Sequence, residues 1–275
     1  MRMGGKPSPF GIDEEQLDEA IDEILELNNL RISGVHLFMG TQILDAEILL
    51  SQYHRAVAIA KQVAARVGPL ETIDFGGGWG TPCFSHETPL DLNKVASGLL
   101  DVDREMAADP LLANTKAIIE PGRFLVNEAG VYLSKVLRTK QSREKLFAVL
   151  DGGMHHHLAA SGNLGQTIKR NYPIAIANKL GIPAEQCVEL VGPLCTPLDT
   201  LGRSVELPAL SAGDVVAVFL SGAYARTSSP LGFLSHNGPA EVLVADENAS
   251  LIRRRGTPED HFADELSVPE DSPRA

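Results

Sequence analysis

The sequence predicts an α/β protein whose first part is a parallel sheet with helices and whose later part is mostly β. Up to residue 120, apolar segments of strand length alternate with longer segments of helical period. After Gly130 the helical period disappears, and short runs rich in β-branched residues replace it. We therefore expect an α/β domain at residues 1–129, a β-sandwich or barrel-like domain at 130–248, and a charged, solvated tail at 249–275.

The predicted helices have recognisable boundary signals. Residues 13–16 read Asp-Glu-Glu-Gln, a capping-box pattern, and open the first helix. A second, alanine-rich helix runs from Ala46 to Val67 and ends at Gly68, because a residue without Cβ suits the left-handed conformation that follows a helix. A third helix covers residues 90–107.

Three predicted strands of the first part, at residues 32–38, 72–75 and 116–119, each lead into a polar or glycine-rich loop. In parallel α/β sheets and barrels, ligands bind beyond the carboxyl ends of the strands. The three loops should therefore converge on one site. The later part offers further strands at residues 131–133, 146–150, 187–191, 214–219 and 241–244.

Composition narrows the class of protein. The 275 residues are 44% hydrophobic, which is enough for a substantial core, and the net charge of −12 argues against a nucleic-acid partner. The three cysteines, Cys83, Cys187 and Cys195, are widely spaced and form no CxxC motif, so a reducing, cytoplasmic compartment is expected. The sequence has neither an apolar run of membrane-spanning length nor the apolar core of a signal peptide, so no membrane partner is expected.

Residues in the three loops are candidates for phosphate binding. Gly76, Gly77 and Gly78 present backbone N–H groups that no Cβ shields, although a tight strand-to-helix turn would use the same glycines. Thr41 could add a hydroxyl to the same phosphate or cap the next helix. Glu120 and Arg123, in Glu-Pro-Gly-Arg, place an acid and a base at one strand end, or are unrelated charges of an exposed turn.

The later part holds other polar candidates. Cys195 lies in a loop after a strand, although a lone cysteine is usually a small core residue. Tyr224 follows the strongest predicted strand, so its hydroxyl could face a cleft. His155, His156 and His157 are consecutive and cannot all face one ion from a strand, so we predict no metal site.

Taken in order, these segments resemble the fold-type III pyridoxal-phosphate-dependent decarboxylases, the ornithine/diaminopimelate decarboxylase family, over nearly the whole chain. Residues 34–42 are similar to the family's G-h-H-x-H-x-G-S-Q, and residues 75–78 to its phosphate loop. Residues 120–123 are its EPGR unchanged. Residues 151–154 resemble D-x-G-M, residues 192–195 GPxC, and residues 222–224 GAY. Within the family, residues 151–163 and 192–199 look most like the subgroup found with bacterial exosortase and exopolysaccharide systems.

The resemblance implies a (β/α)8 barrel of the alanine-racemase/ornithine-decarboxylase type plus a C-terminal β domain, with pyridoxal 5'-phosphate as cofactor. It implies that Glu120 keeps the pyridine nitrogen protonated and that Cys195 donates the proton after decarboxylation, reaching across from a second subunit of a homodimer. Asp199 falls in the segment assigned to the substrate. The implied cofactor contacts are Phe38, Thr41, Gly76, Gly77, Gly78, Glu120, Gly122, Arg123 and Tyr224.

The sequence also departs from the family. The lysine that anchors the cofactor has no match before Gly34, and Lys6 in its Gly/Pro-rich stretch is a poor substitute, so about four of the eight barrel strands are expected to be missing. Thr196 replaces the acidic residue that binds the distal amine of diaminopimelate. Ala159 and Asn163 replace an arginine and a tyrosine that grip that substrate. We therefore expect a different amino acid, or a derivative of one, as substrate.

Two other functions remain open. A non-catalytic pyridoxal-phosphate-binding or regulatory homologue would not need the proton donor Cys195 together with Glu120 and Tyr224. An amino-acid racemase of the same architecture would use a tyrosine and the lysine as its acid/base pair rather than a cysteine.

Overall fold

The computed structural model of the protein describes residues 8–84, 86–166 and 169–266. The chain divides into an N-terminal unit, residues 1–127, and a C-terminal unit, residues 128–275. The predicted domain boundaries at 129 and 248 stay a prediction. None of the helices within the described ranges combines the length and apolar character needed to cross a membrane.

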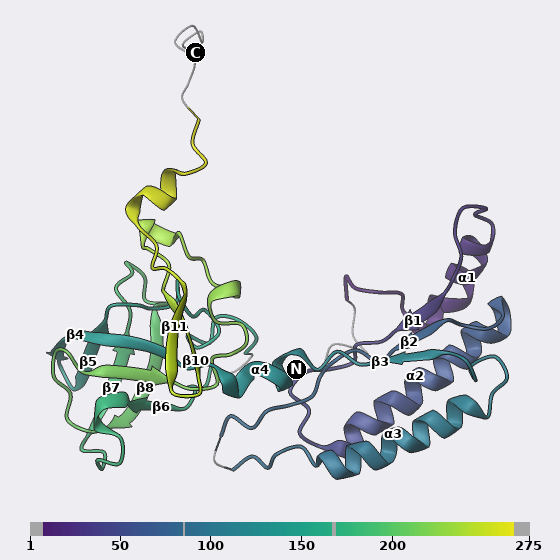
Figure 1. Ribbon diagram of the computed structural model, residues 1–275, viewed down its shortest axis with the longest axis horizontal. Helices are drawn as coiled ribbons and strands as arrows, with labels where there is room; N and C mark the ends of the chain where they lie inside the picture. The colour runs from purple at the N-terminus through teal and green to yellow at the C-terminus, as the bar shows by residue number, and fades with distance from the viewer. Residues whose placement is uncertain (1–7, 85, 167–168, 267–275) are drawn as a thin grey trace, which may run out of the picture. The chain divides into compact units, whose positions relative to one another are not determined.

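The N-terminal unit alternates helices and short strands, as predicted. Its elements are a 3-10 turn at Glu14–Gln16, α1 (Leu17–Leu25), β1 (Gly34–His36), α2 (Ala46–Val67), β2 (Thr72–Asp74), α3 (Leu92–Ala107), β3 (Lys116–Ile118), α4 (Gly122–Val126) and a 3-10 turn at Asn127–Ala129 that crosses the boundary. The strands form a parallel sheet in the order β1-β2-β3. The helices α2 and α3 lie side by side along the sheet (Figure 1).

The core of this unit lies between the sheet and the helices. Ile73 on β2 is fully buried and packs in one cluster with Leu49, Val57 and Ala60 of α2 and Val95 of α3. Because successive strand residues point to opposite faces, the neighbours of Ile73, including Asp74, point away from the helices. The helices thus cover one face and leave the other for polar side chains.

The helix ends agree with the sequence signals at both ends of α2 and differ at the start of α1. Helix α2 has the predicted bounds, and Gly68 after it has φ +91. The side chains of Asp45 and Asp91 accept backbone N–H bonds at the starts of α2 and α3. The capping box predicted at Asp13 is wrong, because the side chain of Asp13 makes no cap bond and the chain enters α1 through a 3-10 turn.

The C-terminal unit is built mainly of strands. They are β4 (Tyr132–Ser142), β5 (Lys145–Leu150), β6 (Ile174–Ile176), β7 (Gln186–Val191), β8 (Thr200–Leu207), β9 (Val215–Val218), β10 (Glu241–Ala245) and β11 (Asn248–Arg253), with 3-10 turns at Ala177–Lys179, Arg226–Ser228, Phe233–Ser235 and Pro258–Phe262. One sheet has the order β6-β9-β4-β5-β7-β8, and β10 pairs with β11 as an antiparallel hairpin. The core of the C-terminal unit contains buried residues of β4, β5, β7, β8 and β9. The hairpin continues past residue 248, so the start of the expected tail is a strand.

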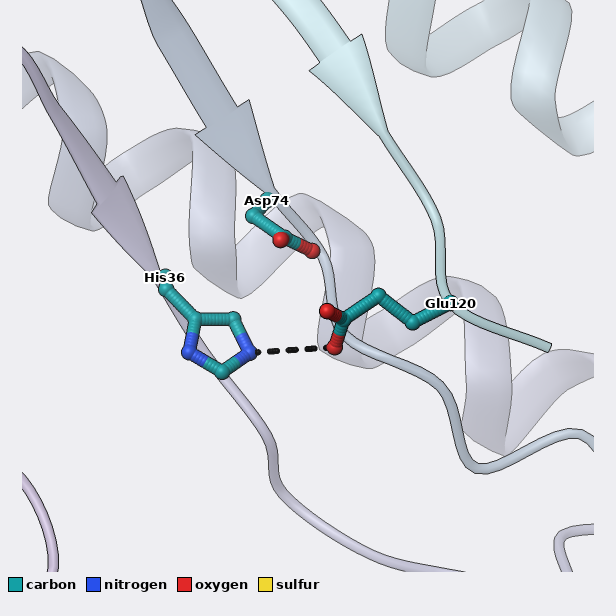
Figure 2. Close-up of side chains that lie close together, drawn as sticks. All are labelled: His36, Asp74 and Glu120. Carbon is teal, nitrogen blue, oxygen red and sulfur yellow. Dashed lines mark ion pairs between the residues drawn. The ribbon is translucent and has the colours of Figure 1, made fainter. Parts of the chain in front are cut away.

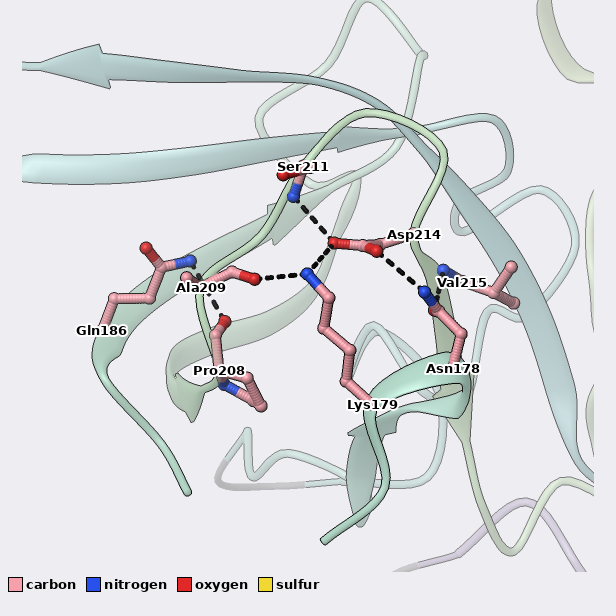
Figure 3. Close-up of polar contacts among 8 residues, drawn as sticks. All are labelled: Asn178, Lys179, Gln186, Pro208, Ala209, Ser211, Asp214 and Val215. Atoms are coloured by element: carbon pink, nitrogen blue, oxygen red, sulfur yellow. Dashed lines mark hydrogen bonds and ion pairs between the residues drawn. The ribbon is translucent and has the colours of Figure 1, made fainter. Parts of the chain in front are cut away.

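A buried aspartate fastens the turn that leads into β9. Asp214 accepts hydrogen bonds from the side chain of Asn178 at 2.9 Å and from the backbone N–H of Ser211 at 2.7 Å, and it pairs with the Lys179 ammonium at 2.7 Å (Figure 3). Burial is the largest single effect on the pKa of Asp214 and raises it. The hydrogen bonds and the Lys179 charge together outweigh burial, so the pKa is lowered. The carboxylate therefore joins the turn at 211–214 to the segment after β6.

Candidate functional site

A polar cluster lies at the carboxyl ends of the three parallel strands. In the sheet register His36 pairs with Asp74, and Asp74 pairs with Ile118. Glu120 stands two residues after Ile118 and therefore points to the same side of the sheet. Figure 2 shows His36, Asp74 and Glu120 turned toward one another from β1, β2 and the end of β3. The predicted convergence of the strand ends is confirmed for these segments.

The cluster is compact and open. The Nε2 atom of His36 lies 3.4 Å from Oε2 of Glu120, and both side chains are more than half exposed. Nitrogen or oxygen atoms of all three residues lie within 4.8 Å of one another, a spacing that could hold a metal ion. Two carboxylates beside an imidazole could equally hold a protonated ring nitrogen of a ligand. His36 and Asp74 were not assigned roles from the sequence.

The glycine loop passes between the two neighbouring strand ends at very close range. A Cβ on Gly76 would lie 2.7 Å from the carbonyl oxygen of Leu37, and one on Gly77 would lie 2.3 Å from the carbonyl oxygen of Glu120. Gly76 has φ +67 and Gly78 has φ +94, which disfavour other residues. Glycines are therefore required here, because the loop packs directly against the backbones of Leu37 and Glu120. Without Cβ atoms they also do not shield the loop's N–H groups.

Hydrogen bonds fasten this loop on both sides. The N–H of Gly76 donates to Oδ1 of Asp74 at 2.9 Å, and the N–H of Glu120 donates to the carbonyl oxygen of Gly76 at 2.8 Å. The side chain of Gln42 exchanges two bonds with the backbone of Thr81, at 3.0 and 3.1 Å. The loop after β1, which carries Thr41, is thus tied to the chain that leaves the glycine loop.

Other predicted cofactor contacts surround the same strand ends. Phe38 is 39% exposed, and its Cδ2 would lie 3.1 Å from a Cβ on Gly76, so its ring borders the glycine loop. Gly122 and Arg123 are the first residues of α4, which begins two residues after Glu120. The positive charge of Arg123 opposes the rise in the pKa of Cys83, which is caused mainly by burial. Phe38, Thr41, Glu120 and Arg123 therefore belong to one region of the N-terminal unit.

The remaining predicted residues lie in the C-terminal unit. Cys195 is exposed in the loop between β7 and β8, and Asp199 at the end of that loop is buried. Tyr224, in the segment after β9, is 49% exposed and has φ +56, an uncommon conformation for a tyrosine. Its carbonyl oxygen accepts a bond from the hydroxyl of Ser228 at 2.6 Å.

The three consecutive histidines are buried, and the ring nitrogens of His156 and His157 have hydrogen-bond partners. Nε2 of His156 contacts the carbonyl oxygen of Asn237 at 2.8 Å, and its Nδ1 contacts the Tyr132 hydroxyl at 3.1 Å. A carbonyl oxygen only accepts, so Nε2 carries a proton, and burial lowers the pKa of His156, which favours the neutral ring. Burial lowers the pKa of His155 to about 3, and the neighbouring histidines add to the effect. No pattern in the sequence indicated that these histidines are buried.

Comparison with known proteins identifies the family. Residues 32–222 match the model of the pyridoxal-dependent decarboxylase family described as its C-terminal sheet domain. The chain belongs to the pyridoxal-dependent decarboxylases. The matched range includes all three parallel strands and the loop that carries Cys195.

Similar proteins agree with this family. The chain is 40% identical over 272 residues to an L-glutamyl-[BtrI acyl-carrier protein] decarboxylase of Niallia circulans, covering 98% of this chain and 63% of that protein. It is 32% identical over 257 residues to a diaminopimelate decarboxylase of Methanothermobacter thermautotrophicus, covering 92% of this chain and 58% of that protein. The chain thus spans about three fifths of the length of these curated relatives.

Solved structures confirm the predicted fold class. The diaminopimelate decarboxylase of Helicobacter pylori complexed with L-lysine has a TM-score of 0.79 and 27% identity, covering 95% of this chain and 61% of that one. The fold class is that of an α/β barrel followed by a C-terminal sheet domain, as the sequence resemblance implied. The parallel sheet β1-β2-β3 with its helices is the barrel part in this chain.

Proposed function

We propose that this chain takes part in the pyridoxal-phosphate-dependent decarboxylation of an amino acid or an amino-acid derivative other than diaminopimelate. The observation that carries this proposal is the cluster of His36, Asp74 and Glu120 beside the glycine loop, in a chain of this family. The cluster lies at the strand ends, where ligands of parallel α/β proteins bind.

The residues of the N-terminal unit fit the cofactor. The glycine loop lies beside the cluster at the strand ends, and its residues carry no Cβ that could shield their backbone N–H groups from a phosphate. Glu120 is open to solvent at the strand end and would hold a ring nitrogen in its protonated form, and the exposed ring of Phe38 would stack on an aromatic ligand. When bound, pyridoxal phosphate supplies an electron sink for the bond that breaks at the substrate carboxylate.

Cys195 is the proposed proton donor. The bond between the substrate carbon and its carboxylate breaks, CO2 leaves, and the electron pair remains with the substrate. The Sγ–H bond of Cys195 then breaks, and its proton forms the new C–H bond on that carbon. The exposure of Cys195 supports this role, because the thiol must reach a substrate. As in the family resemblance, we propose that Cys195 acts in the site of a second subunit, so the active form is a homodimer.

The proposed substrate lacks the distal charge of diaminopimelate. Ala159, at the family's arginine position, is buried and apolar. Asn163 donates to the hydroxyl of Ser161 at 2.7 Å and to the carbonyl oxygen of Leu198 at 3.1 Å, so its amide is held by the protein itself. Thr196 carries no charge. The similarity to a decarboxylase of a glutamyl group on an acyl-carrier protein favours a carrier-bound aminoacyl group.

We also propose that no lysine of the described N-terminal unit anchors the cofactor. Lys61 pairs with Glu105 and Lys94 with Glu47, both on helices, and Lys116 begins β3 at the end opposite to the cluster. Lys6 lies outside the described residues. The proposed subgroup is the one found with exosortase systems. The free cysteines support a reducing, cytoplasmic location.

The proposal is tested in a form of the protein that includes a cofactor-anchoring lysine, by adding pyridoxal phosphate and measuring CO2 release from meso-diaminopimelate, L-glutamate and an L-glutamyl thioester. We expect release from the thioester, and a loss of roughly 100-fold or more in Glu120→Gln and Cys195→Ala. Cys187→Ala, which removes an exposed thiol elsewhere, is the matched control. Efficient turnover of diaminopimelate would refute the substrate proposal. Borohydride reduction that fixes the cofactor to Lys61, Lys94 or Lys116 would refute the proposal about lysine.

A further inference from the structure

Asp199 joins two loops of the C-terminal unit through one carboxylate. Its Oδ1 accepts the backbone N–H of Met154 at 2.6 Å, and its Oδ2 accepts the backbone N–H of Leu194 at 2.8 Å. The N–H of Gly192 also donates to the carbonyl oxygen of Asp199, at 3.0 Å. The side chain is thus a link between residues 151–154 and the loop at 192–199.

Two glycines form the space that the carboxylate occupies. A Cβ on Gly153 would lie 2.1 Å from Oδ1 of Asp199, and a Cβ on Gly192 would lie 2.2 Å from Oδ2. Contacts this short require atoms to move, so neither position accepts a larger residue while Asp199 stays in place. The close fit leaves Asp199 only 2% exposed.

This arrangement fixes the backbone directly before Cys195. The bond to Leu194 holds the peptide that precedes the thiol, and the N–H of Thr196 donates back to the carbonyl oxygen of Leu194 at 2.8 Å. Hydrogen bonds to an ionised carboxylate are stronger than those between neutral groups. Cys195 is therefore exposed, while the backbone of the preceding residue, Leu194, is fixed by hydrogen bonds at both its N–H and its carbonyl oxygen.

We propose that Asp199 is a positioning residue that holds the Cys195 thiol for proton transfer, an inference that rests on the function proposed above. From the sequence, Asp199 was predicted to contact the substrate. The geometry favours the positioning role, because both carboxylate oxygens already accept backbone N–H bonds and the side chain is shielded from solvent.

The first test needs no enzyme activity. Asp199→Asn offers one acceptor oxygen in place of two, so one of the two N–H groups loses its partner. We expect hydrogen exchange at Leu194 or Met154 to accelerate roughly 10- to 100-fold, and alkylation of Cys195 to change several-fold relative to the exposed Cys187. If Asp199→Asn does not fold, Asp199→Glu displaces the same two oxygens by one methylene and serves instead.

The matched control is Asp214→Asn, which removes another buried aspartate of the same unit whose bonds go to residues 178, 179 and 211 (Figure 3). It should leave exchange at Leu194 and alkylation of Cys195 unchanged. Wild-type exchange and alkylation rates in Asp199→Asn would overturn the proposal.

The second test is a double-mutant cycle in the decarboxylation assay. If Asp199 acts through Cys195, Asp199→Asn lowers kcat with little change in KM, and it lowers kcat no further in a Cys195→Ala background. Equal losses in both backgrounds would show a general structural role, and a rise in KM alone would show substrate binding. Either result overturns the proposal. If the lysine-bearing form of the protein releases no CO2, the proposed function fails, and the exchange and alkylation rates still decide whether Asp199 positions Cys195.

Discussion

Protonation of His157 should destabilise the protein in mild acid. His157 is fully buried, with the rings of Tyr132 and Tyr172 edge-on to it. The N–H of Ala160 donates to Nδ1 at 3.2 Å, so Nε2 carries the proton and donates to the hydroxyl of Ser221 at 3.0 Å. A second proton on Nδ1 would face the Ala160 N–H. Burial accordingly lowers the pKa of His157 to about 4.

The magnitude follows from linkage. In the unfolded chain the histidine titrates near the model-peptide value of about 6.5. The unfolded state therefore binds more protons than the folded state over this range, and stability falls as the pH decreases from about 6.5 toward about 4. At about pH 5 the loss attributable to His157 is about 2 kcal/mol. Above about pH 7 it is negligible.

The assay compares unfolding free energies from denaturant titrations near neutral pH and at about pH 5. His157→Gln keeps a donor for Ser221 but cannot be protonated, so its loss on acidification should be smaller than that of the wild type by about 2 kcal/mol. His86→Gln, at an exposed histidine, should keep the wild-type difference. Equal losses in wild type and His157→Gln would refute the reasoning.

Two further substitutions test the N-terminal unit. Trp79→Phe removes the donor to the buried Tyr53 hydroxyl, 2.6 Å away, and should lower the free energy of unfolding by about 1–3 kcal/mol in denaturant titrations. Gly76→Ala, where φ is +67 and the Cβ would meet the carbonyl oxygen of Leu37, should weaken pyridoxal-phosphate binding at least tenfold in a spectroscopic titration. Gly238→Ala, where a Cβ meets nothing within 4 Å, should bind like the wild type.

The location of the candidate site was predictable because parallel strands end at the same edge of a sheet. That rule led to the loops after all three strands and to Glu120. It did not lead to His36 and Asp74, because the predicted strands ran to residues 38 and 75, whereas β1 and β2 end at His36 and Asp74.

Other features depend on contacts that no local pattern encodes. The burial of Asp199 results from Gly153 and Gly192, which are distant from each other in sequence. Strand β8 was not predicted because Gly202 and charged residues interrupt its apolar pattern, and it is held by pairing with β7. The capping box at Asp13 is absent because the N–H of Gln16 donates to the carbonyl oxygen of Asp13 in a 3-10 turn and not to its side chain.

The two readings of the triple glycine, phosphate cradle and tight turn, follow from the same geometry. Without side chains, Gly76, Gly77 and Gly78 bring the loop against the carbonyl oxygens of Leu37, Glu120 and Gly40. This approach sets where Glu120 stands relative to His36, because the Glu120 N–H bonds to the Gly76 carbonyl oxygen. A substitution in the loop should therefore disturb the carboxylate cluster as well as any bound phosphate. Structural need and ligand binding favour the same residue type here, which is why the glycine motif alone could not distinguish them.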